Sequence, residues 1–104
     1  QTGTPSGYTL EITSIEPEED IISQNFPNPF NPTTRIEFAL NNTKNVMIDV
    51  YDIVGRKVAT LVDGQLNSGF HSITFDGSGL ASGVYLYRIV TDEIVITKKM
   101  LLIK

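Results

Sequence analysis

Apolar residues recur at every second position along the chain from residue 33 onward. Ile36, Phe38 and Leu40 are separated by single charged or small residues. Successive side chains of a β-strand point to opposite faces, so this spacing predicts a strand with one face on a core and the other toward solvent. No window of the sequence shows helical spacing over ten residues together with a capping residue.

The same spacing predicts five more strands, each bounded by residues that favour turns. Their expected ranges are residues 46–53, 57–62, 70–75, 84–90 and 94–103. Between the second and third of these five, Asp63-Gly64 and Asn67-Ser68-Gly69 indicate a loop. Short strands separated by turns at intervals of about ten residues are typical of immunoglobulin-like modules. The sequence thus predicts an all-β, immunoglobulin-like antiparallel β-sandwich of about seven strands with an N-terminal linker.

A proline-rich segment, residues 25–34, precedes the first of these strands. It holds three of the chain's five prolines, each of which fixes its own φ and favours an extended residue before it. The segment therefore cannot be helical and marks the boundary between a linker and a folded module. We expect residues 1–24 to be an acidic linker or edge segment and residues 25–104 to be the folded domain.

The leader offers one possible strand of its own. Apolar and polar residues alternate over residues 8–15, but the acidic, proline-containing stretch that follows resists packing, so a linker is the favoured interpretation. Ile21 and Ile22 are expected to attach the end of the leader to the module.

Composition and charge exclude several classes of function. The leader acids Glu11, Glu16, Glu18, Glu19 and Asp20 contribute −5 to the net charge of −4, so the remainder carries about +1. A nearly neutral module with few paired basic residues does not resemble a nucleic-acid-binding surface. The chain has no cysteine, which excludes disulfides and thiolate catalysis and makes a zinc site improbable. No apolar run approaches the roughly 20 residues of a transmembrane helix. Because Gln1 is an unlikely translation start, we expect the chain to be part of a longer protein.

Catalytic candidates are few, and each has a structural alternative. The side chains concerned are Asp52, Asp63, Asp76, His71, Ser72, Ser78 and Ser82, from which a triad could in principle be assembled. Carboxylates at turns usually accept backbone N–H groups, so we expect Asp52 and Asp76 to be structural. For His71 a half-buried packing role with a backbone hydrogen bond is favoured. We expect no catalytic residue, no cofactor and no metal.

Three further features admit a functional or a structural interpretation. Lys44 or Lys98 could form an isopeptide crosslink to an asparagine, but the spacing gives this no support. Tyr85 and Tyr87, with Phe70, could form an aromatic binding strip, although strand tyrosines more often bond their hydroxyl to a nearby corner. Residues 98–104 form a very apolar strand flanked by lysines, which either keep it soluble or make it a handle for another protein.

Five motifs together resemble the type A C-terminal sorting domain of the type IX (Por) secretion system, in that family's order and spacing over residues 24–104. They are residues 25–34 (NFPNPFNPTT), 50–56 (VYDIVGR), 69–76 (GFHSITFD), 80–87 (LASGVYLY) and 99–104 (KMLLIK). The chain is less similar to the immunoglobulin-like domain of flagellar hook-cap proteins.

The resemblance implies a non-enzymatic signal that directs an upstream cargo protein, by way of the periplasm, through the outer-membrane translocon to the medium or cell surface. Implied partners are translocon or shuttle proteins and a sortase-like protease that cuts before Asn25. The residues implied in recognition are Gly83, Tyr85, Lys98, Lys99, Met100, Leu101, Leu102, Ile103 and Lys104. A partner strand could extend residues 99–104 by β-augmentation. An accessory binding module, a structural module of an extracellular protein and a hook-cap type assembly domain stay open as alternatives.

Overall fold

The computed structural model describes residues 19–104, which form seven β-strands. Within these residues there is no helix, and so none that is long and apolar enough to cross a membrane. The strands are β1 (Ile21–Ile22), β2 (Thr33–Leu40), β3 (Lys44–Asp52), β4 (Lys57–Leu66), β5 (Gly69–Asp76), β6 (Gly83–Thr91) and β7 (Val95–Leu102). The strand considered for residues 8–15 lies outside the described residues.

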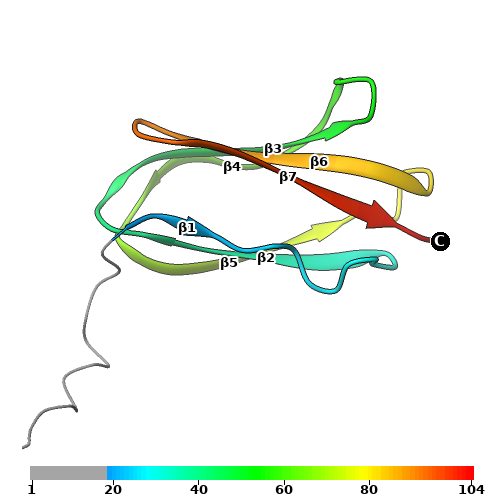
Figure 1. The fold of residues 1–104 in the computed structure, drawn as a ribbon, viewed down its shortest axis with the longest axis horizontal. Coiled ribbons are helices and arrows are strands. Elements are labelled where there is room, and N and C mark those ends of the chain that lie inside the picture. The colour runs from blue at the N-terminus through cyan, green and yellow to red at the C-terminus, as the bar shows by residue number, and fades with distance from the viewer. Residues whose placement is uncertain (1–18) are drawn as a thin grey trace, which may run out of the picture.

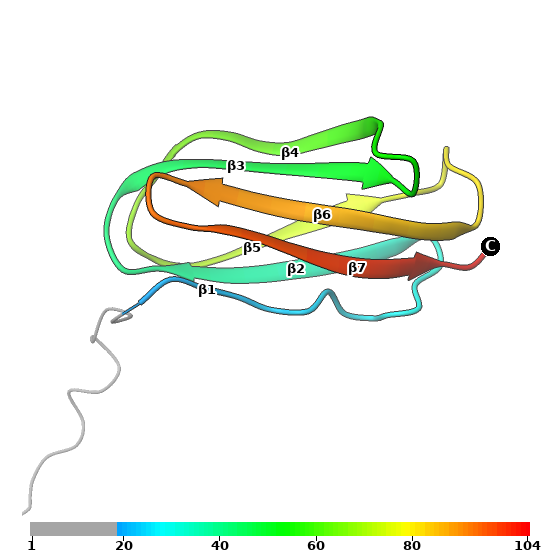
Figure 2. The same cartoon turned by 45° about the horizontal axis from the view of Figure 1, so that its top comes forward.

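The strands form two antiparallel sheets that lie face to face (Figure 1). One sheet has the order β1-β2-β5 and the other the order β4-β3-β6-β7. Turned by 45°, the larger sheet lies in front of the smaller one with β7 at its edge (Figure 2). This arrangement confirms the predicted immunoglobulin-like sandwich.

The apolar side chains of the predicted alternation point inward and form the core between the two sheets. Ile36, Ile48 and Tyr87 are 0% exposed, and each lies on a strand whose neighbouring positions point the other way. Burying side chains of this size is the main favourable contribution to folding, about 1.5–3 kcal/mol for each. The other buried apolar residues of this core are Ile22, Phe30, Phe38, Leu40, Val46, Val50, Phe75, Tyr85, Ile89, Met100 and Leu102.

The expected loop after residue 62 is wrong at its start, because β4 continues to Leu66. Asp63 pairs with Met47 and Gly64 with Val46, so both residues lie in the ladder with β3. Asp and Gly favour turns when nothing else fixes the backbone, but a neighbouring strand that supplies hydrogen-bond partners can override that preference. The β3–β4 pair also contains two register shifts, near Asp49 and Tyr51.

The end of the leader is part of the sandwich. Ile21 pairs with Ala39 and Ile22 with Phe38, which confirms the expected attachment at these two isoleucines. Ser23 then donates its N–H to the Glu37 carbonyl at 2.8 Å. The described fold thus extends upstream of the proline-rich segment, as far as β1.

After β1 the chain crosses from one sheet to the other, and we call residues 23–30 the crossing segment. Phe26 exchanges two backbone hydrogen bonds with Arg35 of β2, both 2.9 Å. Phe30 then donates to the Leu101 carbonyl and accepts from the Ile103 N–H, again at 2.9 Å, which makes a parallel bridge to the end of β7. The peptide bonds before Pro27 and Pro29 in this segment, and before Pro32, are cis.

Candidate functional site

The C-terminal strand divides the expected recognition residues into two groups. Met100 and Leu102 are 1% and 0% exposed and belong to the core. The side chains of Lys99, Leu101, Ile103 and Lys104 are exposed, and that of Lys98 is half-buried. Only the second group can contact a partner while the sandwich stays folded.

Gly83 and Tyr85 build the corner at which β6 begins. The hydroxyl of Tyr85, which is 7% exposed, donates to the Ala81 carbonyl at 2.6 Å, so the tyrosine-corner interpretation is confirmed. Gly83 has a φ of 152°, which an L side chain rarely adopts, and it pairs with Leu102. Both residues therefore position the end of β7.

Four backbone groups on the outer edge of β7 between residues 99 and 103 already have partners in the chain, which does not favour the β-augmentation expected there. The Gln24 side-chain amide donates to the Lys99 carbonyl at 2.8 Å, and the Leu101 N–H donates to Asn28 Oδ1 at 3.0 Å. The Phe30 N–H donates to the Leu101 carbonyl, and the Phe30 carbonyl accepts from the Ile103 N–H. A partner strand would have to displace the crossing segment before it could pair with these residues.

The Tyr87 hydroxyl, which extends from β6, anchors the crossing segment through two hydrogen bonds. It accepts the Asn25 N–H and donates to the Ser23 carbonyl, each at 2.8 Å, and burial raises the pKa of Tyr87 to about 12. The buried Asn25 side chain in turn donates to Thr34 Oγ1 at 3.0 Å. These bonds satisfy polar groups that would be costly if left unpaired.

The proposed aromatic strip does not form. Tyr85 and Tyr87 are buried on the inner face of β6, whereas Phe70 is 79% exposed on the other sheet. A binding strip needs coplanar exposed rings, so these three residues give no support to an accessory binding module.

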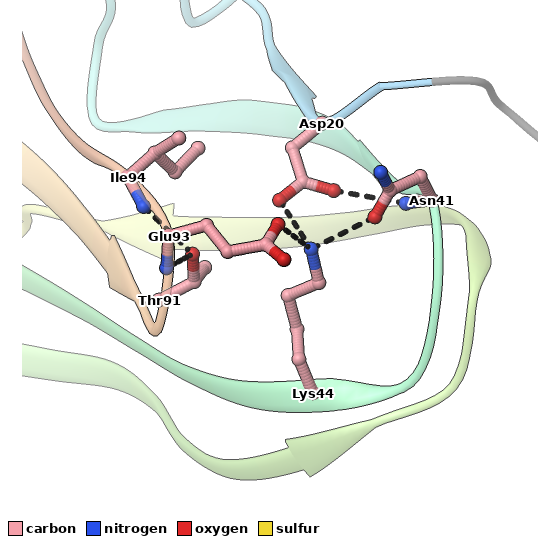
Figure 3. Close-up of polar contacts among 6 residues, drawn as sticks. All are labelled: Asp20, Asn41, Lys44, Thr91, Glu93 and Ile94. Carbon is pink, nitrogen blue, oxygen red and sulfur yellow. Dashed lines mark hydrogen bonds and ion pairs between the residues drawn. The ribbon is translucent and has the colours of Figure 1, made fainter.

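A buried lysine joins the start of the fold to two turns, and we call Asp20, Asn41, Lys44 and Glu93 the Lys44 clasp (Figure 3). Lys44 Nζ lies 2.6 Å from Asp20 Oδ2, 2.9 Å from Asn41 Oδ1 and 2.9 Å from Glu93 Oε1. The side chains of Lys44 and Asp20 are 3% and 5% exposed. The clasp thereby ties the residue before β1 to the β2–β3 turn and the β6–β7 turn.

The clasp keeps both of its central groups charged. The hydrogen bond to Asp20 raises the pKa of Lys44 despite partial desolvation. Desolvation alone would raise the pKa of Asp20, but the hydrogen bonds from Lys44 and the Asn41 N–H bring it below its ordinary value. An ammonium group is not a nucleophile, so this environment does not favour an amide crosslink from Lys44.

The sequence does not predict the clasp, because Asp20 ends an acidic run that is typical of a solvated leader. The one available sequence signal is Lys44 itself, a lysine between a turn and an apolar strand. This signal does not specify which carboxylate the lysine pairs with.

The turn carboxylates have the predicted structural role. Asp52 accepts N–H groups from Val54 and Arg56 at 3.1 and 2.9 Å and pairs with the Arg56 side chain at 2.7 Å. Asp76 accepts the Ser78 N–H at 2.9 Å. These backbone hydrogen bonds are the main reason that the pKa values of both carboxyl groups lie below the ordinary value.

His71 is also a packing residue, as predicted. Its ring stacks on Phe38 with centroids 5.2 Å apart, and its Nε2–H donates to the Asn67 carbonyl at 2.8 Å. Ser72 follows it on the opposite face of β5, and Asp63 lies on β4 in the other sheet. The structure therefore does not assemble a triad from these residues. Residues 19–104 also contain no group of three or more His, Asp or Glu side chains that could hold a metal ion.

A protein-family model described as "Secretion system C-terminal sorting domain" matches residues 24–104. The fold is similar to part of dimeric latent PorU from Porphyromonas gingivalis, with a TM-score of 0.65 and 25% identity over 86% of this chain and 10% of that chain. It is also similar to part of PorZ, an essential bacterial surface component of the type-IX secretion system of Porphyromonas gingivalis. There the TM-score is 0.52 and the identity 19%, over 78% of this chain and 11% of that chain, which supports the fold alone. This chain thus spans about a tenth of the length of each structure. No curated protein sequence matches it.

Proposed function

The chain belongs to the secretion system C-terminal sorting domain family, and from this membership we propose that it directs an upstream cargo through the outer-membrane translocon of the type IX system. The observation that carries the proposal is the extent of the match, which runs from residue 24 through strands β2 to β7 to Lys104. The folded domain as a whole is then the signal. Its role is non-enzymatic, and its route leads to the cell surface or the medium.

Recognition by a translocon or shuttle protein would use the exposed part of the C-terminal strand. Lys99, Leu101 and Ile103 present exposed side chains at the end of β7. Lys104 is also exposed, but its ammonium group donates to the Ser78 and Leu80 carbonyls. Lys98 is half-buried and contributes at the margin of the same strand. The buried residues Met100, Leu102 and Tyr85, with Gly83, hold the strand in place for that contact.

Removal of the domain by a sortase-like protease would occur upstream of Asp20. Proteases bind their substrates in extended form, with the backbone groups free to pair. Residues 21–23 already pair with β2, and the Asp20 side chain is held in the Lys44 clasp. Cleavage within residues 20–23 would require β1 to detach. We therefore place the cleavage site before Asp20, which is a narrower range than the site before Asn25 that the resemblance implies.

The proposal is tested by placing the 104-residue chain behind a signal peptide and a fluorescent reporter in a bacterium that has the type IX system. We expect the reporter on the cell surface or in the medium, whereas a matched fusion without residues 19–104 stays in the periplasm. Retention of the complete fusion in the periplasm would contradict the proposal. Equal export of both fusions would favour a structural module instead.

A second pair of variants tests whether the fold is the signal. Leu102→Asp places a carboxylate in the core, where an unpaired charge is very costly, and we expect the fusion to lose export. Thr74→Asp places the same carboxylate at an exposed outward position of β5 and should be exported. Export of an unfolded Leu102→Asp fusion would show that a linear sequence is sufficient.

A further inference from the structure

The outer faces of the two sheets differ in chemistry. Two outward residues of β2 and β5 are apolar, the buried Ala39 and the exposed Phe70. The other six are polar and exposed: Thr33, Arg35, Glu37, Ser72, Thr74 and Asp76. Outward positions of the other sheet form what we call the apolar outer face: Met47, Tyr51, Val84, Leu86, Val90, Val95 and Leu101. An antiparallel sheet with one face toward water normally has polar residues there, as the smaller sheet does.

The strand register arranges these apolar residues in rows on either side of one polar row, which consists of Asp49, Arg88 and Thr97. Leu86 of β6 pairs with Tyr51 of β3 on one side and with Lys99 of β7 on the other. In the next row toward the C-terminus of β7, Val84 pairs with Leu101. At the opposite end Met47, Val90 and Val95 form a third row. Apart from Arg88, the outward residues of β6 are apolar like its inward ones, which is the pattern of a strand that is covered on both sides.

Two shallow hollows lie on this face beside the C-terminal strand. One, of ≈ 220 Å³, is lined by Tyr51, Gly55, Leu86, Arg88 and Thr97. The other, of ≈ 330 Å³, is lined by residues that include Val84, Lys99 and Leu101 together with two residues of the crossing segment, Asn28 and Pro29. Each has room for a side chain of another molecule, with apolar groups contributing much of its lining.

The two cations beside these hollows are Arg88 and Lys99. Asp49, the outward carboxylate opposite Arg88 in the register, is 5% exposed and is held by Thr60 and Lys57 instead. Arg88 lies over the Tyr51 ring, 4.9 Å from its centroid, and donates to its hydroxyl at 2.7 Å. Within residues 19–104 neither Arg88 nor Lys99 forms a salt bridge with a carboxylate. A binding surface with carboxylates opposite these two cations would complement them.

We propose that the apolar outer face is the docking surface for a protein of the sorting pathway, whose own surface is apolar at its centre and carries carboxylates facing Arg88 and Lys99. The inference rests on the proposed sorting function and specifies how the C-terminal strand is recognised. Recognition uses outward side chains of β3, β6 and β7. The backbone edge of β7 stays paired with the crossing segment.

The test uses the reporter fusion with two matched substitutions, one on each sheet. Leu86→Lys places a charge at the centre of the apolar outer face, and we expect export to fall about tenfold or more, which is the effect of about 1.4 kcal/mol on binding. Thr74→Lys makes the same change at an outward position of β5 and should leave export within about twofold of the parent. Purified full-length variants must first show unfolding midpoints close to the parent; if Leu86→Lys does not, the milder Val84→Thr replaces it.

The charge complement is tested separately at Lys99. Lys99→Glu should reduce export, because its carboxylate would repel the partner's carboxylates. Lys99→Arg keeps the positive charge and should be exported like the parent. Full export of Leu86→Lys from a host that exports the parent would overturn this inference and leave the sorting function intact. Failure of the parent itself would instead overturn the sorting function.

Two other occupants of this face have distinct results. Concentration-dependent dimerisation in analytical ultracentrifugation that Leu86→Lys abolishes would assign the face to a second copy of the chain. Binding to vesicles of phosphatidylethanolamine and phosphatidylglycerol that Leu86→Lys abolishes would assign it to lipid. Either result would overturn the proposal of a protein partner.

Discussion

Tyr87→Phe tests whether the crossing segment is held by the buried phenol. The substitution keeps the ring and removes one hydroxyl, so the Asn25 N–H loses its acceptor and the Ser23 carbonyl loses its donor. An unsatisfied buried polar group costs about 1–3 kcal/mol. Asn25 is 2% exposed and should incur most of this cost, whereas water can reach Ser23. We therefore expect a loss of about 2–4 kcal/mol in the free energy of unfolding.

Urea denaturation and thermal unfolding of the purified chain measure this loss. For a domain of this size, about 1 kcal/mol shifts the unfolding midpoint by roughly 4–8 °C, so Tyr87→Phe should lower it by roughly 8–32 °C. Tyr85→Phe is the matched control, because it removes one partly buried hydrogen bond and should cost about 1 kcal/mol. If the two variants were equally stable, or if Tyr87→Phe lay within about 0.5 kcal/mol of the parent, the reasoning would be refuted.

The same hydroxyl predicts a difference at alkaline pH. The folded-state pKa of Tyr87, about 12, lies above its ordinary value of 10.0, so the fold favours the protonated phenol. Its contribution is complete below pH 10 and is lost as the pH rises toward 12. Over that interval the stability of the parent should fall more steeply than that of Tyr87→Phe, by up to about 1.4 kcal/mol per pH unit. Parallel pH profiles for the two proteins would contradict this.

Three further predictions concern other contacts. Phe30→Ala should cost about 3–5 kcal/mol in urea denaturation, because this 2% exposed ring packs on Phe75; an unchanged midpoint would exclude a core role. Lys44→Met should make the bond after Asp20 susceptible to limited proteolysis, detected by mass spectrometry, whereas the parent is protected there; identical fragments would show that the clasp does not protect it. Asp52→Asn should weaken the loss of stability below about pH 4, since the lowered pKa of this carboxyl stabilises the parent only above that range; unchanged acid unfolding would refute this.

The alternation of side chains was sufficient to predict the fold class. Ile36, Phe38 and Leu40 are buried because their two-residue spacing leaves a strand one way to place them on a core. The tyrosine corner at Tyr85 and the turn carboxylate at Asp52 were also predictable, since both depend on partners within four residues in the sequence.

The contacts that the sequence did not reveal join residues far apart in the chain. Lys44 is 24 residues from Asp20 and 49 from Glu93, and no local pattern specifies such a pairing. The closed edge of β7 likewise depends on residues 24–30 crossing between the sheets. The sequence indicated that residues 25–34 are stiff, but it did not indicate where they pair. For the same reason the apolar outer face became visible only once the register had placed β6 between β3 and β7.

The parallel bridge between Phe30 and the end of β7 also determines how the domain bears mechanical load. A cargo that precedes residue 19 and a partner that holds the C-terminal strand would pull the ends of this parallel pair in opposite directions along the strand axes. The hydrogen bonds of Phe30 to Leu101 and Ile103 lie across that direction, so the force would shear them together and could not open them one at a time. The segment that closes the sandwich would thus keep it intact under tension during transport.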